Sequence, residues 1–94
     1  MSRKNNYVLV GILEDMTEQM HFNNKGSDLY KRVLTIKTED SQIIYPEIRN
    51  SNLKLLELEQ IVLKDKVQIF FTFEGSTLQD KKFNNIHIHA IKKL

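Results

Sequence analysis

The apolar positions of this 94-residue chain follow two periods, and the points where the period changes predict the order of its elements. A dense apolar run over residues 7–13 predicts a first strand, in which Gly11 marks a bend or a bulge. Over residues 30–38 the pattern alternates, with Leu34 and Ile36 on one side and basic residues on the other. Alternation of this kind predicts a second strand with a buried side and a basic side.

A polar segment and an interrupted apolar segment flank this second strand. Residues 21–28 predict a loop, in which Asn24 and Gly26 are suited to positive φ. Residues 43–48 predict a third strand. Because proline cannot donate to a strand ladder, Pro46 places an edge or an irregularity within it.

The period then becomes helical and afterwards returns to alternation. Leucines at helical spacing predict a short helix at about residues 52–60, with residues 50–52 supplying the N-cap. Residues 67–73 predict a fourth strand, residues 74–80 a hairpin loop and residues 83–91 a last strand. On these two strands, alternation places one set of residues on the inner face: Val67, Ile69, Phe71, Phe73, Ile86, Ile88 and Ala90.

Three strands, a short helix and a two-stranded hairpin define an all-β fold, a β-barrel with one short helix. This order is that of the five-stranded OB-fold, with the helix at 52–60 between strands three and four. An SH3-like barrel or another small β-roll is the alternative, but neither accounts for the helix. At 94 residues the chain is expected to form a single domain, residues 1–94, without room for a large internal pocket.

Composition narrows the classes of function. The chain has no cysteine, which excludes disulfides, thiolate zinc sites and cysteine nucleophiles. No apolar run approaches the roughly 20 residues of a membrane span, and the N-terminal residues do not resemble a secretion signal. We therefore expect a cytoplasmic protein with no membrane contact.

The formal net charge of +2 is small, but its distribution is uneven. Residues 21–38 contain four basic residues and one acidic residue, and residues 81–94 contain four lysines and no acidic residue. Residues 14–20 and 39–48 are acidic. If the two basic segments share a face, that face attracts a polyanion; mixed charge of this kind also occurs on ordinary solvated surface.

Several segments together resemble a known family. They are Tyr30–Asp40 (YKRVLTIKTED), Leu55–Leu56, Leu63–Gly75 (LKDKVQIFFTFEG) and Phe83–Ile86 (FNNI). In order and spacing they are similar to a domain-of-unknown-function family of short bacterial and phage OB-fold proteins, which is itself similar to single-stranded-DNA-binding proteins. The resemblance spans about residues 7–93. It implies an OB-fold and a role in binding single-stranded DNA.

Single-stranded nucleic acid is bound by basic side chains that contact phosphates and by aromatic faces on which bases stack. Tyr45, beside Pro46 on the third strand, is the aromatic residue that we expect to stack most directly. Phe22 and Tyr30 could instead close the end of the barrel, and Lys81 and Lys82 could be solvated hairpin lysines. The full set of candidate binding residues is Phe22, Lys25, Tyr30, Lys31, Arg32, Lys37, Tyr45, Arg49, Lys81, Lys82 and Phe83.

Metal and catalytic sites are disfavoured. His87 and His89 share a strand face, but a zinc site needs further ligands and His21 is the only other histidine. Glu14, Asp15 and Glu18 offer carboxylates without a nucleophile or a phosphate-binding glycine loop. We therefore expect no enzyme activity, no metal and no other cofactor.

The leading hypothesis is a protein that binds single-stranded DNA with little sequence preference, in replication, recombination or phage DNA metabolism. RNA is the alternative nucleic acid. Because one OB-fold covers only about 4–16 nucleotides, we expect a homodimer or homotetramer. The alternative function is a protein-interaction module or an inhibitor subunit, phage-encoded for example, that acts through a protein partner without nucleic acid; the fold also occurs in oligosaccharide binding.

Overall fold

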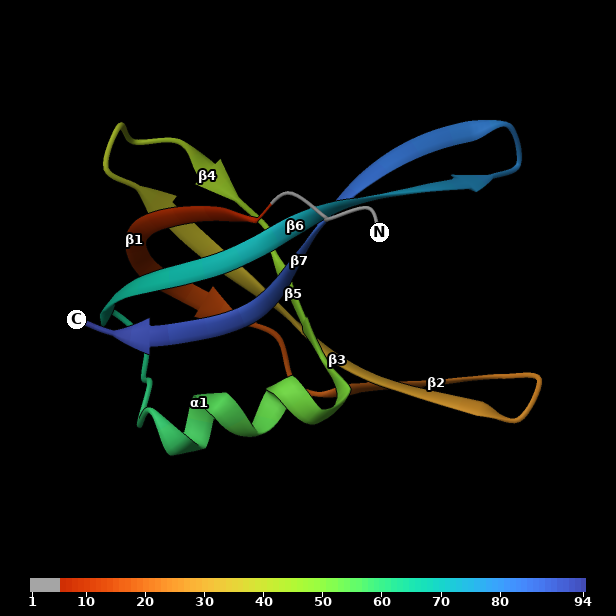
Figure 1. Ribbon diagram of the computed structural model, residues 1–94, viewed down its shortest axis with the longest axis horizontal. Helices are drawn as coiled ribbons and strands as arrows, with labels where there is room; N and C mark the ends of the chain where they lie inside the picture. Colours follow the sequence, from red (N-terminus) through yellow and green to blue (C-terminus); the bar gives the residue numbers. More distant parts are fainter. Residues whose placement is uncertain (1–5) are drawn as a thin grey trace.

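A computed structural model describes residues 6–94 of the protein, apart from the side chains of Asn24, Ser76 and Leu78 (Figure 1). Strands make up most of the chain, and the helical residues lie in one short segment. The elements are β1 (Tyr7–Met16), β2 (Met20–Asn24), β3 (Ser27–Thr38), β4 (Ile43–Ile44), β5 (Glu47–Arg49), a 3-10 helix (Asn50–Lys54), α1 (Leu55–Leu58), β6 (Lys66–Leu78) and β7 (Lys81–Lys93).

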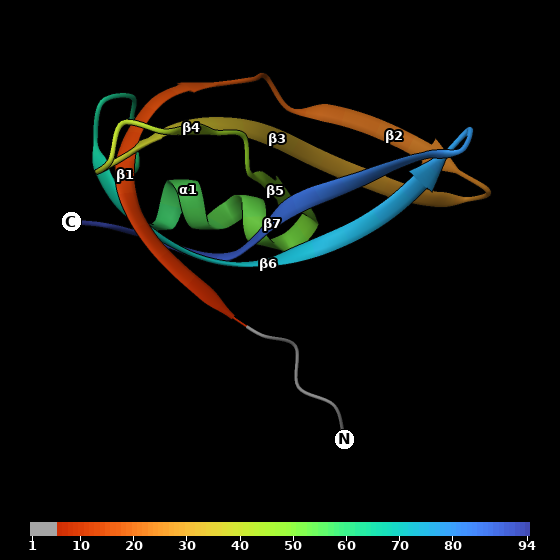
Figure 2. The same ribbon diagram turned by 90° about the horizontal axis from the view of Figure 1, so that it is seen from above.

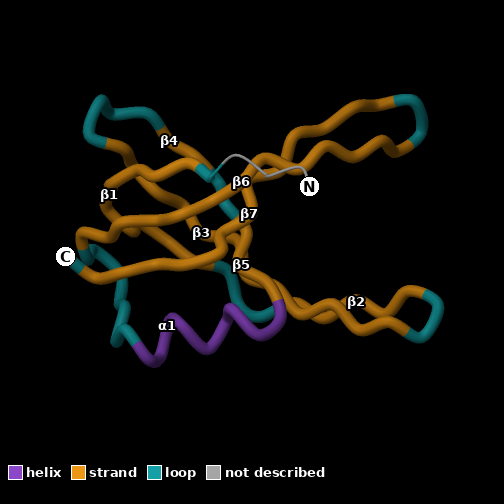
Figure 3. Tube along the Cα trace, viewed as in Figure 1, coloured by secondary structure: helices purple, strands orange, loops and turns teal. Residues whose placement is uncertain are grey.

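The strands close into a barrel. β1 pairs antiparallel with β6 on one side and with β3 on the other, and β6 pairs antiparallel with β7. β5 pairs with β3 and completes the ring through one parallel pair, Glu47 with His87 of β7. This closed five-stranded barrel, with the helical segment between its third and fourth strands, confirms the predicted fold (Figure 3).

The barrel interior is aliphatic. Leu34 and Ile36 of β3 are fully buried, as the alternation of that strand predicted. α1 lies beside the barrel in Figure 1 and adds Leu56 to the core. The other buried apolar side chains are Leu13, Ile48, Ile61, Val67, Ile69, Phe71, Ile88 and Ile91. No helix among the described residues is long and apolar enough to cross a membrane.

Gly11 lies where β1 begins to pair with β3 while it still pairs with β6. A Cβ atom at this position would lie 2.6 Å from Ile36 Cγ2 and 2.6 Å from the Lys37 carbonyl oxygen. Such distances lie well inside van der Waals contact. Glycine therefore allows β1 and β3 to approach each other closely at this position. The irregularity in the β1–β3 register lies further along, between Leu13 and Asp15.

Two segments predicted as loops are instead β-hairpins. Residues 21–28 belong to β2 and β3, which meet at a turn formed by Lys25 and Gly26, both with positive φ. Asn24, predicted in the turn, pairs with Ser27 in the ladder. Residues 74–78 extend β6, and only Gln79 and Asp80, again with positive φ, form the second turn. Two central residues of positive φ are the mark of a type I′ turn, whose twist matches that of antiparallel strands.

These hairpins project from the barrel as two arms. We call residues 20–31 the first arm and residues 73–86 the second arm. Both extend from the same side of the barrel in Figure 1, and their tips lie at a similar depth in Figure 2. The prediction of loops was wrong because the arms lie outside the barrel. Neither arm packs on a core, so its sequence lacks the apolar alternation by which a strand is recognised.

The third predicted strand and the helix also differ in detail. The strand is divided into β4 and β5 at Tyr45 and Pro46, the irregularity that proline predicted. The helical segment spans residues 50–58 rather than 52–60, and no side chain caps its start. The Asn50 side chain, predicted as a cap, instead accepts a hydrogen bond from the Tyr30 backbone N–H (3.0 Å).

The inner face of the last strand changes at a β-bulge. Phe70 pairs with Ala90 but Phe71 pairs with Ile88, so His89 is an extra residue in β7. This insertion reverses the alternation beyond it. Ile91, predicted to face outward, is therefore buried in place of Ala90. On β6, Phe73 was predicted to face the core, but it lies beyond the barrel at the base of the second arm and is 54% exposed.

Candidate nucleic-acid interface

The outer face of β3, β5 and β7 lies at the base of both arms. Alternation with the buried residues Leu34 and Ile36 places Lys31 and Lys37 on this face. The same reasoning applies to the other two strands, where Ile48 and Ile88 are buried. The outer face therefore also receives Glu47, Arg49, Phe83, Asn85 and His87.

Three aromatic residues predicted to stack bases are exposed on or beside this face. Phe22 of the first arm is 47% exposed, and it pairs in register with Leu29, two residues from Lys31. Lys31 Nζ lies 5.4 Å from the centre of the Phe22 ring. Tyr45, between β4 and β5, is 63% exposed, and Phe83 of the second arm is 45% exposed. Each ring therefore presents surface on which a planar group can stack.

A chain of ion pairs crosses the centre of the outer face. Glu47 Oε1 accepts a hydrogen bond from Lys31 Nζ at 2.7 Å, and Glu47 Oε2 accepts one from Arg49 Nη2 at 2.6 Å. Arg49 Nη1 also lies 3.3 Å from Glu74 Oε2, and His87 Nδ1 lies 3.7 Å from the same oxygen. The ion pairs thus link β3, β5 and β6 and neutralise Lys31 and Arg49, while His87 of β7 lies beside Glu74.

Burial and charge shift the pKa values in this network. Burial alone would raise the pKa of Glu47, but hydrogen bonds from Lys31 and Arg49 outweigh it, so the pKa lies below its ordinary value. Burial likewise opposes the charge of Arg49, yet its carboxylate partners raise the pKa of Arg49. For His87, burial and then the nearby Arg49 lower the pKa, despite the attraction of Glu74. The face therefore carries ionised Glu47 and Arg49 beside a neutral His87 at pH 7.

The remaining predicted residues do not all share this face. Lys25 is exposed in the turn of the first arm, and Lys81 and Lys82 are exposed at the start of β7 beside the second turn. By alternation Lys81 lies on the side of Phe83 and Lys82 on the opposite side. Tyr30 and Arg32 face the opposite side of β3, toward the 3-10 helix and α1. The eleven predicted residues are thus divided between two sides of the molecule.

Sequence reasoning did not identify Glu47 and Glu74 as partners of the predicted cations. A signal for Glu47 was present, since a residue two positions from Arg49 on a strand shares its face. Its contact with Lys31 depends on the register that sets Lys31 opposite Arg49, which spacing alone does not reveal.

The histidines and carboxylates considered for metal binding or catalysis have separate partners. His21 Nε2 lies 2.8 Å from Asp28 Oδ1 in the first arm, whereas His89 Nε2 lies 2.9 Å from Thr72 Oγ1 in the barrel. Glu14 pairs with Lys64, which lowers the pKa of Glu14. Among the described residues, no group of three or more His, Cys, Asp or Glu side chains is placed to hold a metal ion.

The closed barrel, the intervening helix and the two arms define an OB-fold protein. Rim1, the mitochondrial single-stranded-DNA-binding protein of S. cerevisiae, superposes with a TM-score of 0.65 at 12% identity, over 98% of this chain and 97% of that chain. The N-terminal domain of PriB from Thermoanaerobacter tencongensis, described as dimeric, gives 0.54 at 19% identity over 96% of each chain.

The small single-stranded-DNA-binding protein of Streptomyces coelicolor is similar at a TM-score of 0.54 and 11% identity, over 99% of this chain and 95% of that chain. By sequence, no family model and no curated protein matches the chain. The expected likeness to single-stranded-DNA-binding OB-fold proteins is therefore confirmed as a likeness of fold.

Proposed function

We propose that this protein binds single-stranded DNA with little sequence preference, on the outer face between its two arms. The observation that carries the proposal is the exposure of three aromatic residues, Phe22, Tyr45 and Phe83, on or beside the outer face. Both arms flank this face in Figure 1. Two of the OB-fold proteins that it resembles are named as single-stranded-DNA-binding. Replication, recombination or phage DNA metabolism is the setting that such binding serves.

Aromatic stacking supplies the affinity that does not depend on sequence. Every base has a π face, and stacking on an aromatic side chain contributes about 1–3 kcal/mol per base. Phe22, Tyr45 and Phe83 are assigned this role. Tyr45 and Phe83 are exposed, so a base can reach them directly, whereas Lys31 lies over the Phe22 ring and shifts when a base stacks there.

Lysines at the ends of the arms supply the contacts to phosphates. Lys25 in the first turn and Lys81 and Lys82 beside the second are exposed, and Lys37 is exposed at the far end of β3. These four side chains are assigned to phosphates. Lys31 and Arg49 are already paired with Glu47, which fixes their side chains on the outer face. They therefore attract phosphates less strongly than two unpaired cations would.

We assign the protein a homodimeric state through β1. Tyr7 to Val10 pair with β6 on one side, whereas pairing with β3 begins only at Gly11. In the described part of the chain, this half of β1 is therefore an open edge. Tyr7, Val8 and Phe73 are 41%, 52% and 54% exposed there, and a second copy of the strand would cover both the edge and the apolar side chains.

The decisive experiment titrates a fluorescent oligo-dT with the protein at about 50 and 200 mM salt. Binding that weakens with salt, with a similar affinity for mixed-sequence DNA, supports the proposal. Absence of binding at the lower salt contradicts it. Recovery of a specific protein partner in the absence of DNA binding would instead establish the interaction-module alternative. A matched single-stranded RNA distinguishes the two nucleic acids.

A further inference from the structure

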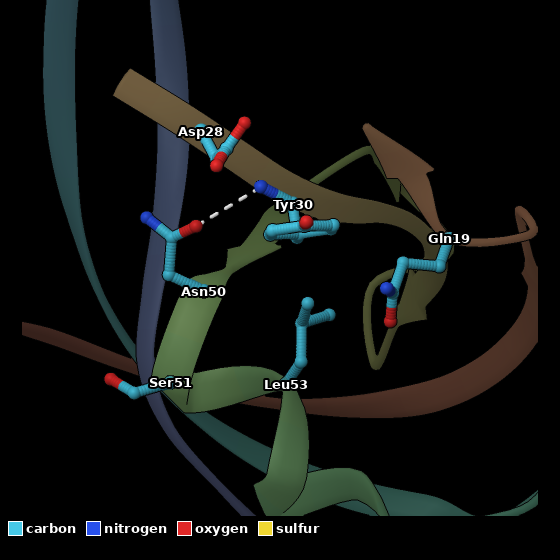
Figure 4. Close-up of a pocket in the computed structure, with 6 residues that line it drawn as sticks. All are labelled: Gln19, Asp28, Tyr30, Asn50, Ser51 and Leu53. Atoms are coloured by element: carbon cyan, nitrogen blue, oxygen red, sulfur yellow. Dashed lines mark hydrogen bonds between the residues drawn. The ribbon is translucent and has the colours of Figure 1, made fainter. Parts of the chain in front are cut away.

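A pocket opens on the other side of the first arm, between β3 and the 3-10 helix (Figure 4). Its volume is about 480 Å³, within the range of roughly 300–1,000 Å³ typical of small-molecule sites. Gln19, Asp28, Tyr30, Asn50, Ser51 and Leu53 line it. The outer face described above does not include this pocket.

Tyr30 is held in place from two directions. The His21 ring stacks on the Tyr30 ring with a centroid separation of 4.4 Å and an interplanar angle of 5°. The Tyr30 backbone N–H donates to Asn50 Oδ1, the contact drawn in Figure 4. His21 covers one face of the Tyr30 ring. Tyr30 is nevertheless 37% exposed, and it lines the pocket. His21 is itself fixed by its 2.8 Å contact with Asp28.

Polar groups surround this aromatic surface. Asp28 presents a carboxylate, and Gln19 and Asn50 present amides that both donate and accept hydrogen bonds. Leu53 supplies an apolar wall. An aromatic surface with donors and acceptors at its border is the arrangement that recognises a nucleobase, by stacking on its plane and hydrogen bonding to its edge.

A second, smaller pocket adjoins the first and is cationic. Its volume is about 190 Å³, and Gln19 and Leu53 line both pockets. It adds Arg32 and Lys54, together with the single carboxylate of Glu57. Arg32 Nε donates to the Thr17 carbonyl oxygen at 2.8 Å, which positions the guanidinium group. A guanidinium and an ammonium beside a base pocket are suited to a phosphate.

The geometry points to a nucleotide subsite formed by the two pockets, with a base on Tyr30 and its phosphate at Arg32 and Lys54. This inference rests on the proposed function. Phe22 and His21 are neighbours in β2, so their side chains lie on opposite sides of the first arm. β2 is the last strand at this end of the sheet, so one of its edges is open. A DNA strand that leaves Phe22 can pass around this edge to reach Tyr30. The subsite thus lengthens the path of one DNA strand around the arm.

Photocrosslinking tests the path directly. An oligonucleotide of about 30 residues, longer than the roughly 4–16 that one OB-fold covers, carries 5-iodouracil at single positions. Mass spectrometry of the irradiated complex should find crosslinks at Tyr30 or His21 in addition to Phe22, Tyr45 or Phe83. Crosslinks confined to the last three residues would overturn the subsite and leave the proposed function standing. Absence of both binding and crosslinks would overturn both.

Affinity measurements separate stacking from folding. Tyr30→Leu should weaken binding of the 30-residue oligonucleotide about 5- to 150-fold, while Tyr30→Phe retains it, because the ring and not the hydroxyl stacks. An oligonucleotide of about 8 residues, which the outer face alone can fill, should bind Tyr30→Leu as well as the parent. Equal affinity of Tyr30→Leu and the parent for the long strand would contradict the subsite. If Tyr30→Leu fails to fold, Ser51→Glu keeps Tyr30 and places a repelling carboxylate in the pocket.

Salt dependence tests the phosphate position. Lys54→Gln should reduce the slope of log K against log salt by about 0.7 for the long strand, the value for one phosphate contact in single-stranded DNA. Lys66→Gln removes an exposed lysine of β6 outside both pockets and is the matched control. An unchanged slope in Lys54→Gln would contradict the proposed phosphate contact of Lys54.

Discussion

Arg49 and Glu47, two residues apart on β5, are joined on the outer face of the barrel by two hydrogen bonds of 2.6 and 3.0 Å to one carboxylate oxygen. The other oxygen of Glu47 accepts from Lys31. One carboxylate therefore holds two cations on the face proposed to bind DNA. Stability and affinity consequently depend on Glu47 in opposite directions.

Glu47→Gln should destabilise the fold and strengthen DNA binding. The Glu47 side chain is only 12% exposed, so its loss leaves the partly buried Lys31 without a counter-ion and Arg49 with Glu74 alone, at a cost of about 2–3 kcal/mol. The released Lys31 and Arg49 then attract phosphates, and the slope of log K against log salt steepens. Urea unfolding and oligo-dT titration measure the two effects. Glu74→Gln, at the more exposed end of the network, is the control and should change both quantities less.

His87 should make stability depend on pH in the range where histidine titrates. Its pKa in the folded protein lies below the ordinary value of 6.5, because of burial, the charge of Arg49 and the neighbouring His89, although Glu74 and Glu47 oppose the shift. The unfolded chain therefore binds more protons in this window. The stabilisation is complete above pH 6.5 and is lost as the pH falls from 6.5 through the folded pKa.

Urea unfolding of the parent and of His87→Gln, at a series of pH values from 7.5 to about 5, measures this contribution. The parent should lose more stability than the variant across the window. Parallel curves for the two proteins would show that His87 does not contribute.

Gly11→Ala should destabilise the barrel by about 1–3 kcal/mol, because a methyl group there overlaps Ile36 and the Lys37 carbonyl. Gly75→Ala is a matched control in the second arm, where the nearest atoms to an added Cβ lie 4.0 Å away. Thermal unfolding of both variants measures the difference. Equal melting temperatures would show that β1 and β3 can separate at Gly11 without cost.

Tyr45→Ala should weaken oligo-dT binding by about 1–3 kcal/mol while leaving the melting temperature close to that of the parent, because an exposed ring that stacks a base contributes little to the core. Phe83→Ala should act in the same direction. Ile43→Ala, also exposed beside β3, lacks an aromatic ring and is the control. An affinity unaffected by the loss of Tyr45 would remove this residue from the interface.

Val8→Lys should convert a dimer into a monomer, since a charged side chain on the open edge of β1 opposes pairing with a second copy. Leu58→Lys introduces the same charge at a 69% exposed aliphatic position on α1 and should leave the dimer intact. Light scattering coupled to gel filtration gives the mass of each protein. A parent protein that is monomeric at all concentrations would contradict the assigned state.

The barrel was predictable because its strands alternate against a core. Leu34 and Ile36 on β3, and Val67 and Ile69 on β6, show the period of two that burial of one face imposes. The arms have no such constraint, and their polar sequences were interpreted as loops. The first turn contains one glycine, Gly26, and the second contains none, so neither has the Asn-Gly or Asp-Gly pair typical of a type I′ turn.

The candidate site was predictable in its residue types but not in its arrangement. Phe22, Tyr45 and Phe83 were candidates because of their segments, and all three are exposed, although the sequence left open whether Phe22 closes the end of the barrel. The placement of Tyr30 on the other side of β3 was less evident, because its alternation with Leu34 fits a core or barrel-mouth position as well as an exposed one. A bulge such as that at His89 reverses alternation without a sequence signal strong enough to locate it.

The closure of the barrel at β5 and β7 has a consequence for its local stability. A single backbone pair, Glu47 with His87, joins these strands, and the side chains of Arg49 and Glu74 span the same junction. Few main-chain hydrogen bonds protect this seam, so it should open without unfolding of the whole barrel. Amide hydrogens near Glu47 should therefore exchange with solvent faster than those of the β1–β6 ladder, and more so at high salt, where the side-chain contacts are screened.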